Sequence, residues 1–218
     1  MPSKDSGVTE IVSFIIIISL IIAACLIWIM VAVPIHGENN EITHNDEVLL
    51  EMANLKYDID TLMSSNILGV SRSCIVSFGP RGDKTQVTFL PDLSSMFSGG
   101  TIRLEAGETI RNNEGGNSGY SKLKITYQSA NRYAENVWIC YDGGKLYNSP
   151  ASYTSGRPLM TSLHSSSTDI ISAVENGYLE ELGGNEFAVI TFKLVNQVPF
   201  DGKMVNVFEL DTGGTYNG

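Results

Sequence analysis

The stretch IVSFIIIISLIIAACLIWIMVAVPI, residues 11–35, decides how the rest of the chain is organised. Residues 11–37 contain no Asp, Glu, Lys or Arg. A helix rises about 1.5 Å per residue, so residues 11–33 reach about 35 Å, which exceeds the ~30 Å of a bilayer's hydrocarbon core. The run therefore predicts a membrane-spanning helix, with residues 1–35 forming a short lead and the anchor.

The charges on either side of this run predict its orientation. The lead carries Lys4, whereas the far side begins with Glu38 and Glu41 and has no basic residue before Lys56. Positive charge favours the cytoplasmic side of a membrane. We therefore expect the N-terminus in the cytoplasm, one crossing, and the C-terminal domain outside the cell.

The average composition conceals this division of the chain. The 218 residues include 14 basic and 24 acidic ones, with a net charge of −10 and a mean hydropathy of +0.03. That mean combines an apolar anchor with an acidic, exported domain. An acidic chain repels a phosphate backbone, so the composition argues against nucleic-acid binding.

The apolar run has three other possible interpretations: a cleavable secretory signal, a lipoprotein signal and a generic single-pass anchor. A cleavable secretory signal has an apolar region of about 7–15 residues, so this run is too long for one. The sequence Ile22-Ala23-Ala24-Cys25 is similar to a lipoprotein signal, but a lipidated cysteine would be followed here by ten more apolar residues, LIWIMVAVPI. A generic single-pass anchor stays open as an alternative.

The residues just before the run resemble a known processing signal. Residues 6–14, SGVTEIVSF, place a carboxylate at the start of the apolar helix, just after a small residue. This stretch is similar to the class III signal of archaeal type IV pilin-like proteins. The resemblance implies that a prepilin peptidase cuts after Gly7, leaving Val8 first in the mature chain. It also implies that Glu10 helps to align the chain against other pilin-like subunits, including copies of itself.

Two further patches carry the same resemblance. Residues 127–133 with 138–144 resemble a strand-loop-strand unit of pilin-like proteins from methanogenic archaea. Those proteins also have a Val-Pro-x-x-Gly step after the membrane helix, which is Val33-Pro34-Ile35-His36-Gly37 here. The resemblance implies a cell-surface location, in the membrane or in a surface filament, and attaches no catalytic activity.

A second helix is predicted after the membrane. Pro34 and Gly37 predict a kink or a short break. Residues 36–66 then show apolar side chains at three- and four-residue steps, which is typical of an amphipathic helix ending near Ser65. We expect this stalk to pack on the chain's own β domain rather than on a partner. The members of its apolar stripe are Ile42, Leu49, Met52, Leu55, Ile59, Leu62 and Met63.

Residues 67–218 read as a β domain. Nineteen of the 21 glycines lie there, among short runs in which apolar residues alternate with polar ones. The predicted fold class is therefore α+β: a long membrane helix, an amphipathic helix and a mainly antiparallel, sandwich-like β domain. The alternating runs are Cys74–Phe78, Val87–Phe89, Ile102–Leu104, Leu123–Tyr127, Val137–Tyr141 and Met204–Leu210.

Finer details of the β domain are also predicted. Residues 187–195 are almost all apolar, which predicts a central strand buried on both faces. Asp142-Gly143 and Asp201-Gly202 predict tight hairpins. Residues 112–119 and 149–156 are predicted to be loops. Residues 165–176 are predicted to contain a short helix.

No sequence motif indicates an enzyme. The chain has no GxSxG, HExxH, Walker or dinucleotide-binding pattern, and Asp211-Thr212-Gly213 is interpreted as a turn. Residues 81–83, Arg-Gly-Asp, are interpreted as a hairpin turn rather than an adhesive site. We expect no catalytic residue and no cofactor. The alternative function is a non-polymerising, membrane-anchored domain that binds a carbohydrate or a protein outside the cell.

Histidines and cysteines give two minor hypotheses. His36, Glu38, Glu41 and His44 could share a helix face as metal ligands, but a solvated linker is the preferred interpretation, so no metal is expected. Cys74 and Cys140 each alternate with apolar residues. They would form a disulfide if their strands were neighbours, or remain buried free thiols.

Overall fold

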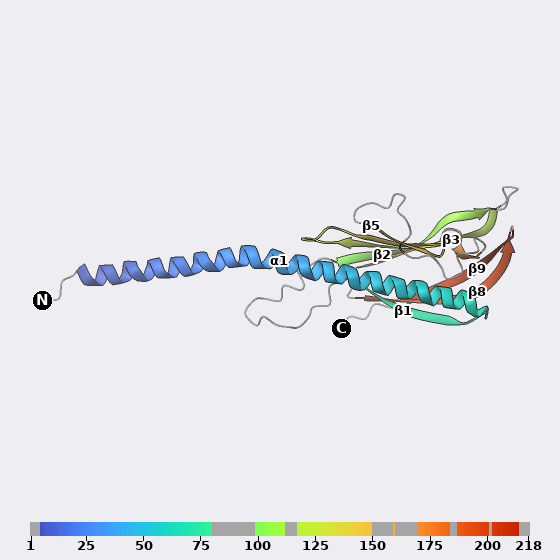
Figure 1. The fold of residues 1–218 in the computed structure, drawn as a ribbon, viewed down its shortest axis with the longest axis horizontal. Helices are drawn as coiled ribbons and strands as arrows, with labels where there is room; N and C mark the ends of the chain where they lie inside the picture. Colours follow the sequence, from blue (N-terminus) through green and yellow to red (C-terminus); the bar gives the residue numbers. More distant parts are fainter. Residues whose placement is uncertain are drawn as a thin grey trace.

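A computed structural model describes residues 5–79, 99–111, 117–149, 159, 170–183, 187–200 and 202–213. The chain forms one long apolar helix followed by a mixed sheet of nine strands, so the predicted α+β class is confirmed (Figure 1). The predicted strand at 87–89 and the turn at 81–83 lie outside the described residues.

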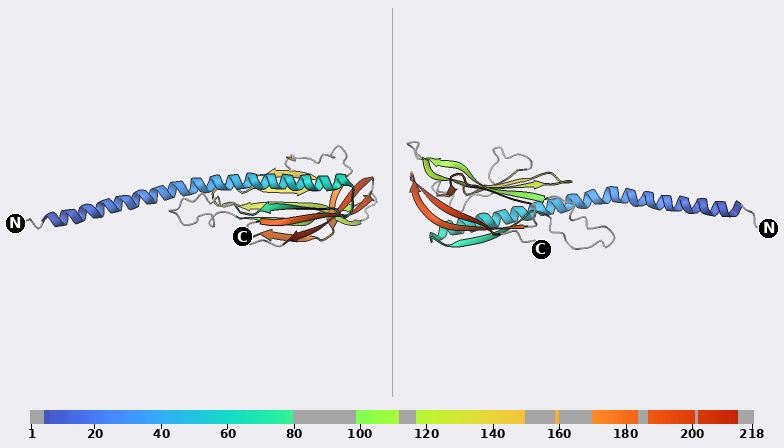
Figure 2. Two further views of the ribbon diagram at one scale, coloured as in Figure 1. Left: turned by 90° about the horizontal axis from the view of Figure 1, so that it is seen from below. Right: turned by 180° about the vertical axis from the view of Figure 1, so that it is seen from behind.

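Helix α1 (Asp5–Ser65) is continuous, so the short break that was one of the two predicted outcomes at Pro34 and Gly37 does not occur. Pro34 lies inside it and removes one backbone hydrogen bond. A break would leave several more backbone groups without their partners within the helix. The ribbon accordingly follows a gentle curve instead of ending (Figure 2).

The nine strands form one hydrogen-bonded network in the order β1-β8-β9-β6-β3-β2-β7, and the β4–β5 hairpin pairs with β3. All pairings are antiparallel except β6 with β9, which is parallel. The strands are β1 (Ser71–Ser77), β2 (Gly99–Arg111), β3 (Asn117–Ala130), β4 (Trp138–Asp142), β5 (Lys145–Ser149), β6 (Ile170–Glu175), β7 (Leu179–Gly183), β8 (Phe187–Phe200) and β9 (Lys203–Gly213).

The C-terminal half of α1 is built into the β domain. One edge of β3 is shared by β6 and β4, so the sheet divides into two arms that end in β1 and β5. Helix α1 contacts both of these outer strands and lies along the opening between the arms (Figures 1 and 2). The predicted stalk and the β domain therefore share a core rather than forming separate units.

That shared core confirms the predicted packing of the helix stripe on the chain's own strands for six of its seven members, whereas Ile42 is 46% exposed. Met52, Leu55, Ile59 and Leu62 are buried in the same cluster as residues of both sheet arms. Full burial of a large apolar side chain contributes about 1.5–3 kcal/mol relative to exposure. The strand members of the cluster include Val76, Phe78, Ile102, Leu104, Ile125, Tyr127, Tyr141, Ile190, Phe192 and Leu194.

Several local predictions are confirmed. The alternating runs within β1, β2, β3, β4 and β9 form strands as expected. Gly143 has φ 55° in the tight turn that joins β4 to β5, where Asp142 pairs with Lys145. Gly202 has φ 74° between the paired residues Phe200 and Lys203, as expected for a β8–β9 hairpin.

Other local predictions are wrong. In β8, Ala188, Ile190, Phe192 and Leu194 are buried but the residues between them are not, so one face is covered rather than two. Residues 170–175 form strand β6 instead of a helix, because they complete the sheet between β3 and β9. Residues 117–119 belong to β3 rather than to a loop, and Asp211-Thr212-Gly213 ends β9 rather than forming a turn.

Candidate functional site

The N-terminal half of α1 presents an apolar surface that nothing in the described chain covers. Every side chain from residue 11 to residue 31 is exposed. The helix is long and apolar enough to cross a membrane. Exposed apolar area of this extent is unfavourable in water, so lipid or other protein must cover it.

The three residues implied in processing and assembly lie at the start of this helix. Gly7, Val8 and Glu10 belong to the first turns of α1, immediately before the exposed run. The structure describes their helical backbone, so their roles stay predictions.

A buried carboxylate joins the helix to the β domain next to the apolar half. Glu41 is 0% exposed and accepts hydrogen bonds from the backbone N–H groups of Arg132, Tyr133 and Ala134, at 2.8, 2.7 and 2.6 Å. These three residues belong to the loop between β3 and β4. Charge-assisted hydrogen bonds of this kind are stronger than neutral ones. Glu41 therefore fixes the position of the loop on the helix.

Two more polar contacts attach the helix to β1. Glu51 accepts hydrogen bonds from the backbone N–H and the hydroxyl of Ser77, at 2.7 and 2.9 Å. Nearer the C-terminal end of the helix, Arg72 pairs with Asp58 at 2.7 Å. Together with the buried apolar stripe, these contacts hold α1 against the strands from Glu41 to Leu62. The apolar half continues from this packed part within the same helix.

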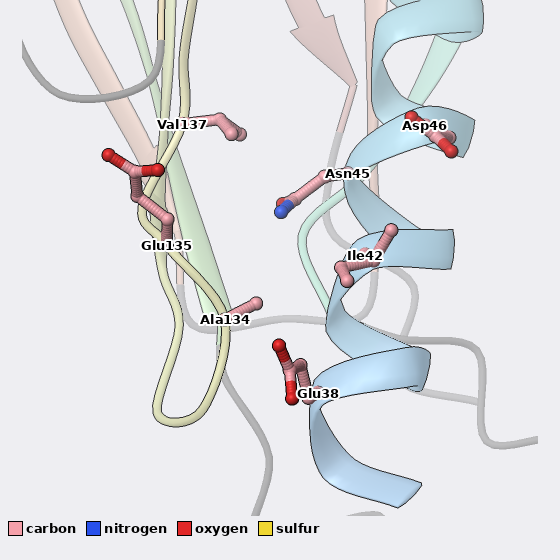
Figure 3. A pocket seen from close by; sticks show the side chains of 7 residues that line it. All are labelled: Glu38, Ile42, Asn45, Asp46, Ala134, Glu135 and Val137. Carbon is pink, nitrogen blue, oxygen red and sulfur yellow. The ribbon is translucent and has the colours of Figure 1, made fainter. Parts of the chain in front are cut away.

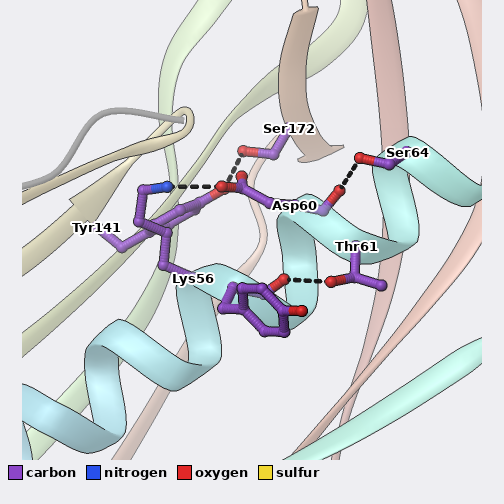
Figure 4. Close-up of polar contacts among 7 residues, drawn as sticks. Lys56, Asp60, Thr61, Ser64, Tyr141 and Ser172 are labelled. Carbon is purple, nitrogen blue, oxygen red and sulfur yellow. Dashed lines mark hydrogen bonds and ion pairs between the residues drawn. The ribbon is translucent and has the colours of Figure 1, made fainter. Parts of the chain in front are cut away.

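An ion pair lies buried deeper in this junction (Figure 4). Lys56 Nζ is 2.6 Å from Asp60 Oδ2, and both side chains are 3% exposed. Beside them the hydroxyls of Tyr141 and Ser172 are hydrogen bonded at 2.8 Å. Burial raises the pKa of Tyr141, and the neighbouring Asp60 carboxylate acts in the same direction. The cluster is closed off from solvent, which suits a structural role better than a catalytic one.

The four residues considered as metal ligands do not converge. Glu41 is occupied by the β3–β4 loop, and His44 is buried with its Nε2 atom 3.2 Å from the hydroxyl of Tyr127. Desolvation lowers the pKa of His44 from its ordinary value. Among the described residues, no group of three or more His, Cys, Asp or Glu side chains is arranged to hold a metal ion.

The two cysteines predicted as a possible disulfide are separate. Cys74 belongs to the core under α1, whereas Cys140 points to the other face of β4, away from its core neighbours Ile139 and Tyr141. Strands β1 and β4 are not paired with each other, and both thiols are free. Cys140 is buried but lies outside the cluster that contains Cys74, because both alternating positions of this short strand are covered.

A cleft of about 290 Å³ opens between α1 and the segment that precedes β4 (Figure 3). Glu38, Ile42, Asn45 and Asp46 line it from the helix, and Ala134, Glu135 and Val137 line it from the opposite side. It lies beside the Glu41 contact, at the end of the head nearest the apolar half of α1.

A second hollow lies on the outer face of the sheet around Trp138, beside Gln128 and Thr126. Ion pairs cross it between neighbouring strands: Arg103 with Glu181 at 2.9 Å, and Lys124 with Glu105 at 2.5 Å. The first pair is exposed and therefore screened by solvent, whereas the second is partly buried. The hollow therefore combines one aromatic ring with polar groups that already have partners.

No protein-family model, curated protein or solved structure matches the chain.

Proposed function

We propose that this chain is a membrane-anchored cell-surface protein of the archaeal type IV pilin-like kind, with a structural role rather than a catalytic one. Its N-terminal helix anchors the chain and assembles with copies of itself or with other pilin-like subunits. The β domain is carried outside the cell. The observation that supports this most is a single helix with one half fully exposed and apolar and the other half built into a β head.

The exposed, apolar half of α1 is compatible with two environments, a lipid bilayer and a bundle of packed helices. A helix that is apolar on all sides is stable in lipid and equally stable when packed against similar helices. Because both environments cover the same surface, transfer from one to the other costs little hydrophobic free energy. The continuous backbone through Pro34 would keep each head in a fixed relation to its own packed helix.

Processing and register follow from the resemblance. Prepilin peptidase would cut between Gly7 and Val8 on the cytoplasmic side, and the apolar run would stay on the mature subunit. Glu10 would then limit how neighbouring helices can be shifted along one another, since an unpaired carboxylate in the apolar core of the assembly is disfavoured.

The hollow around Trp138 favours a second candidate function. Aromatic rings next to polar side chains are typical of sites where a rigid amphipathic group is recognised. A permanently anchored domain that binds a carbohydrate or protein through this face would need no assembly through Glu10.

Replacement of Glu10 separates the two functions. Glu10→Ala should leave membrane insertion intact and reduce the yield of filaments, whereas Thr9→Ala, the matched control, should leave both unchanged. Electron microscopy of sheared surface material and the protein content of the membrane fraction are the two measurements. Unchanged filaments in Glu10→Ala would refute the proposed role of Glu10.

A further inference from the structure

The cleft between α1 and the segment before β4 has an apolar interior and an acidic rim. Ile42, Ala134 and Val137 provide the apolar surface. Glu38 directs its carboxylate from the helix toward the opposite wall (Figure 3). Asp46 and Glu135 add two more carboxylates, and no Lys, Arg or His lines the cleft.

One polar group in this cleft is buried without a partner. Asn45 is 9% exposed and extends from α1 toward the opposite wall (Figure 3). Its Oδ1 atom has no hydrogen-bond partner among the described residues. Leaving such a buried acceptor unsatisfied is destabilising, so a donor that enters the cleft and bonds to it would be favoured.

These features fit the chemistry of a basic side chain. Arginine and lysine have an apolar stem that packs on groups such as Ile42 and Val137, and a cationic head that pairs with carboxylates. A bare metal ion fits less well, because the described acidic side chains do not come together as a ligand set. A guanidinium has several donors in one plane, so it could serve a carboxylate and an amide oxygen together.

Few described basic side chains are free to make such a contact. Arg111, at the end of β2, is exposed and has no ion-pair partner among the described residues. It lies opposite Asn117 in the sheet register, whereas the exposed Lys145 lies opposite Asp142. Arg132, in the loop beside the cleft, is exposed and forms no ion pair with a described residue, but its guanidinium lies over the ring of Tyr133, 5.5 Å from the ring centroid. Among the described residues, the basic side chains that form ion pairs are Lys56, Arg72, Arg103, Lys122, Lys124 and Lys193.

Arg111 and the cleft lie at opposite ends of the head. The first residue of β2, Gly99, pairs with Ala130, next to the loop that binds Glu41. The strand then runs for 13 residues, roughly 40 Å at about 3.3 Å per residue, to Arg111. A contact between Arg111 and the cleft must therefore join two molecules. It is head-to-tail, and such contacts can continue into open-ended assemblies.

We propose that the cleft receives the Arg111 side chain of a second copy, with the guanidinium between Glu38 and Asn45. This inference rests on the proposed function and deepens it, since it names the contact between the heads of assembled subunits. Because the chain carries a net charge of −10, copies repel one another, and a specific cation-to-carboxylate contact offsets part of that repulsion.

Charge reversal in the full-length chain tests the pairing. Glu38→Arg and Arg111→Glu should each lower filament yield about tenfold, and the double variant should restore most of it. The matched controls are Glu47→Arg, an exposed glutamate of α1 outside the cleft, and Lys145→Glu. Both controls should assemble like the wild type. Failure of the double variant to recover, or equal loss in the controls, would overturn the pairing.

Cross-linking identifies the occupant independently. A chain with Glu135→Cys and Arg111→Cys, in a Cys25→Ser background and treated with a short bismaleimide, should give a ladder of multiples of the subunit mass. Either single-cysteine variant should give none. Cross-links to a protein of different mass would overturn the choice of a second copy. Intact filaments without a ladder would overturn this contact but leave the proposed function standing, whereas a wild-type chain that forms no filaments would overturn both.

Discussion

The carboxylate of Glu41 lies 2.7 Å from the backbone nitrogen of Tyr133, although the two residues are 92 positions apart in the chain. The same carboxylate also accepts the N–H groups on either side of Tyr133. One helical side chain thus organises a loop of the β domain and sets one wall of the neighbouring cleft.

We predict that Glu41→Gln destabilises the full-length chain by about 1–3 kcal/mol, because a neutral amide with one oxygen replaces a charged acceptor of three hydrogen bonds. Urea unfolding in detergent measures the difference. Glu47→Gln, which alters an exposed glutamate of the same helix, is the control and should change stability by less than about 0.5 kcal/mol. Equal effects of the two substitutions would contradict the importance of the loop contact.

Removing one member of the buried Lys56–Asp60 pair should lower the free energy of unfolding much more than removing both members. Asp60→Ala leaves the Lys56 ammonium buried without its counter-charge, and we expect a loss of about 3–5 kcal/mol. The double variant Lys56→Met with Asp60→Leu removes both charges and should recover a large part of that loss. A double variant that is less stable than Asp60→Ala would show that the charges do not depend on each other as described.

The stability of the chain should depend on pH through His44. Burial holds the pKa of His44 below 6.5, while Glu47 and Glu51 oppose the shift and Tyr127 is its hydrogen-bond partner. Below about pH 6.5 the unfolded chain therefore binds more protons than the folded chain, so stability falls as the pH falls; above that pH His44 is neutral in both states. The free energy of unfolding should decline more steeply toward about pH 5.5 in the wild type than in His44→Gln. Parallel curves would contradict this role.

The cysteines should behave as two buried free thiols. Burial raises the pKa of Cys74 to about 12 and also raises the pKa of Cys140, so neither is a thiolate at neutral pH. In a Cys25→Ser background, maleimide should label both residues only after unfolding, and a reductant should not shift the unfolding midpoint. A midpoint lowered by reductant would indicate the disulfide that the structure does not contain.

Much of this architecture could be predicted from local sequence patterns. A run without charges is sufficient to predict the exposed apolar helix, and alternation such as Ile102 with Leu104 predicts strands because side chains of a strand point to alternate faces. Asp142-Gly143 predicts its hairpin since the turn requires positive φ.

The incorrect predictions concern positions where distant contacts outweigh local preference. Pro34 and Gly37 favour a kink or a break locally, yet α1 continues through both and is held by packing against the strands along its later turns. Residues 170–175 become a strand because both β3 and β9 offer unpaired edges to them. Residues 170–175 themselves give no sign that β3 and β9 lie on either side of them.

The junction around Glu41 was also not predictable. Its partners are backbone N–H groups, which every residue except proline possesses, so no side-chain pattern marks them. The available signal was a glutamate on the helix face that carries Val48 and Met52, both buried in the core. A charged residue on a buried face requires a partner, although its sequence position does not identify which.

The mature N-terminus tests the central claim most directly, namely that the apolar helix is a processed, pilin-like assembly helix rather than a simple anchor. Mass spectrometry of the protein purified from cell surfaces should find an N-terminal peptide that begins at Val8, with residues 1–7 removed. A chain that begins at Met1 or Pro2, or one that carries lipid on Cys25, would contradict the account.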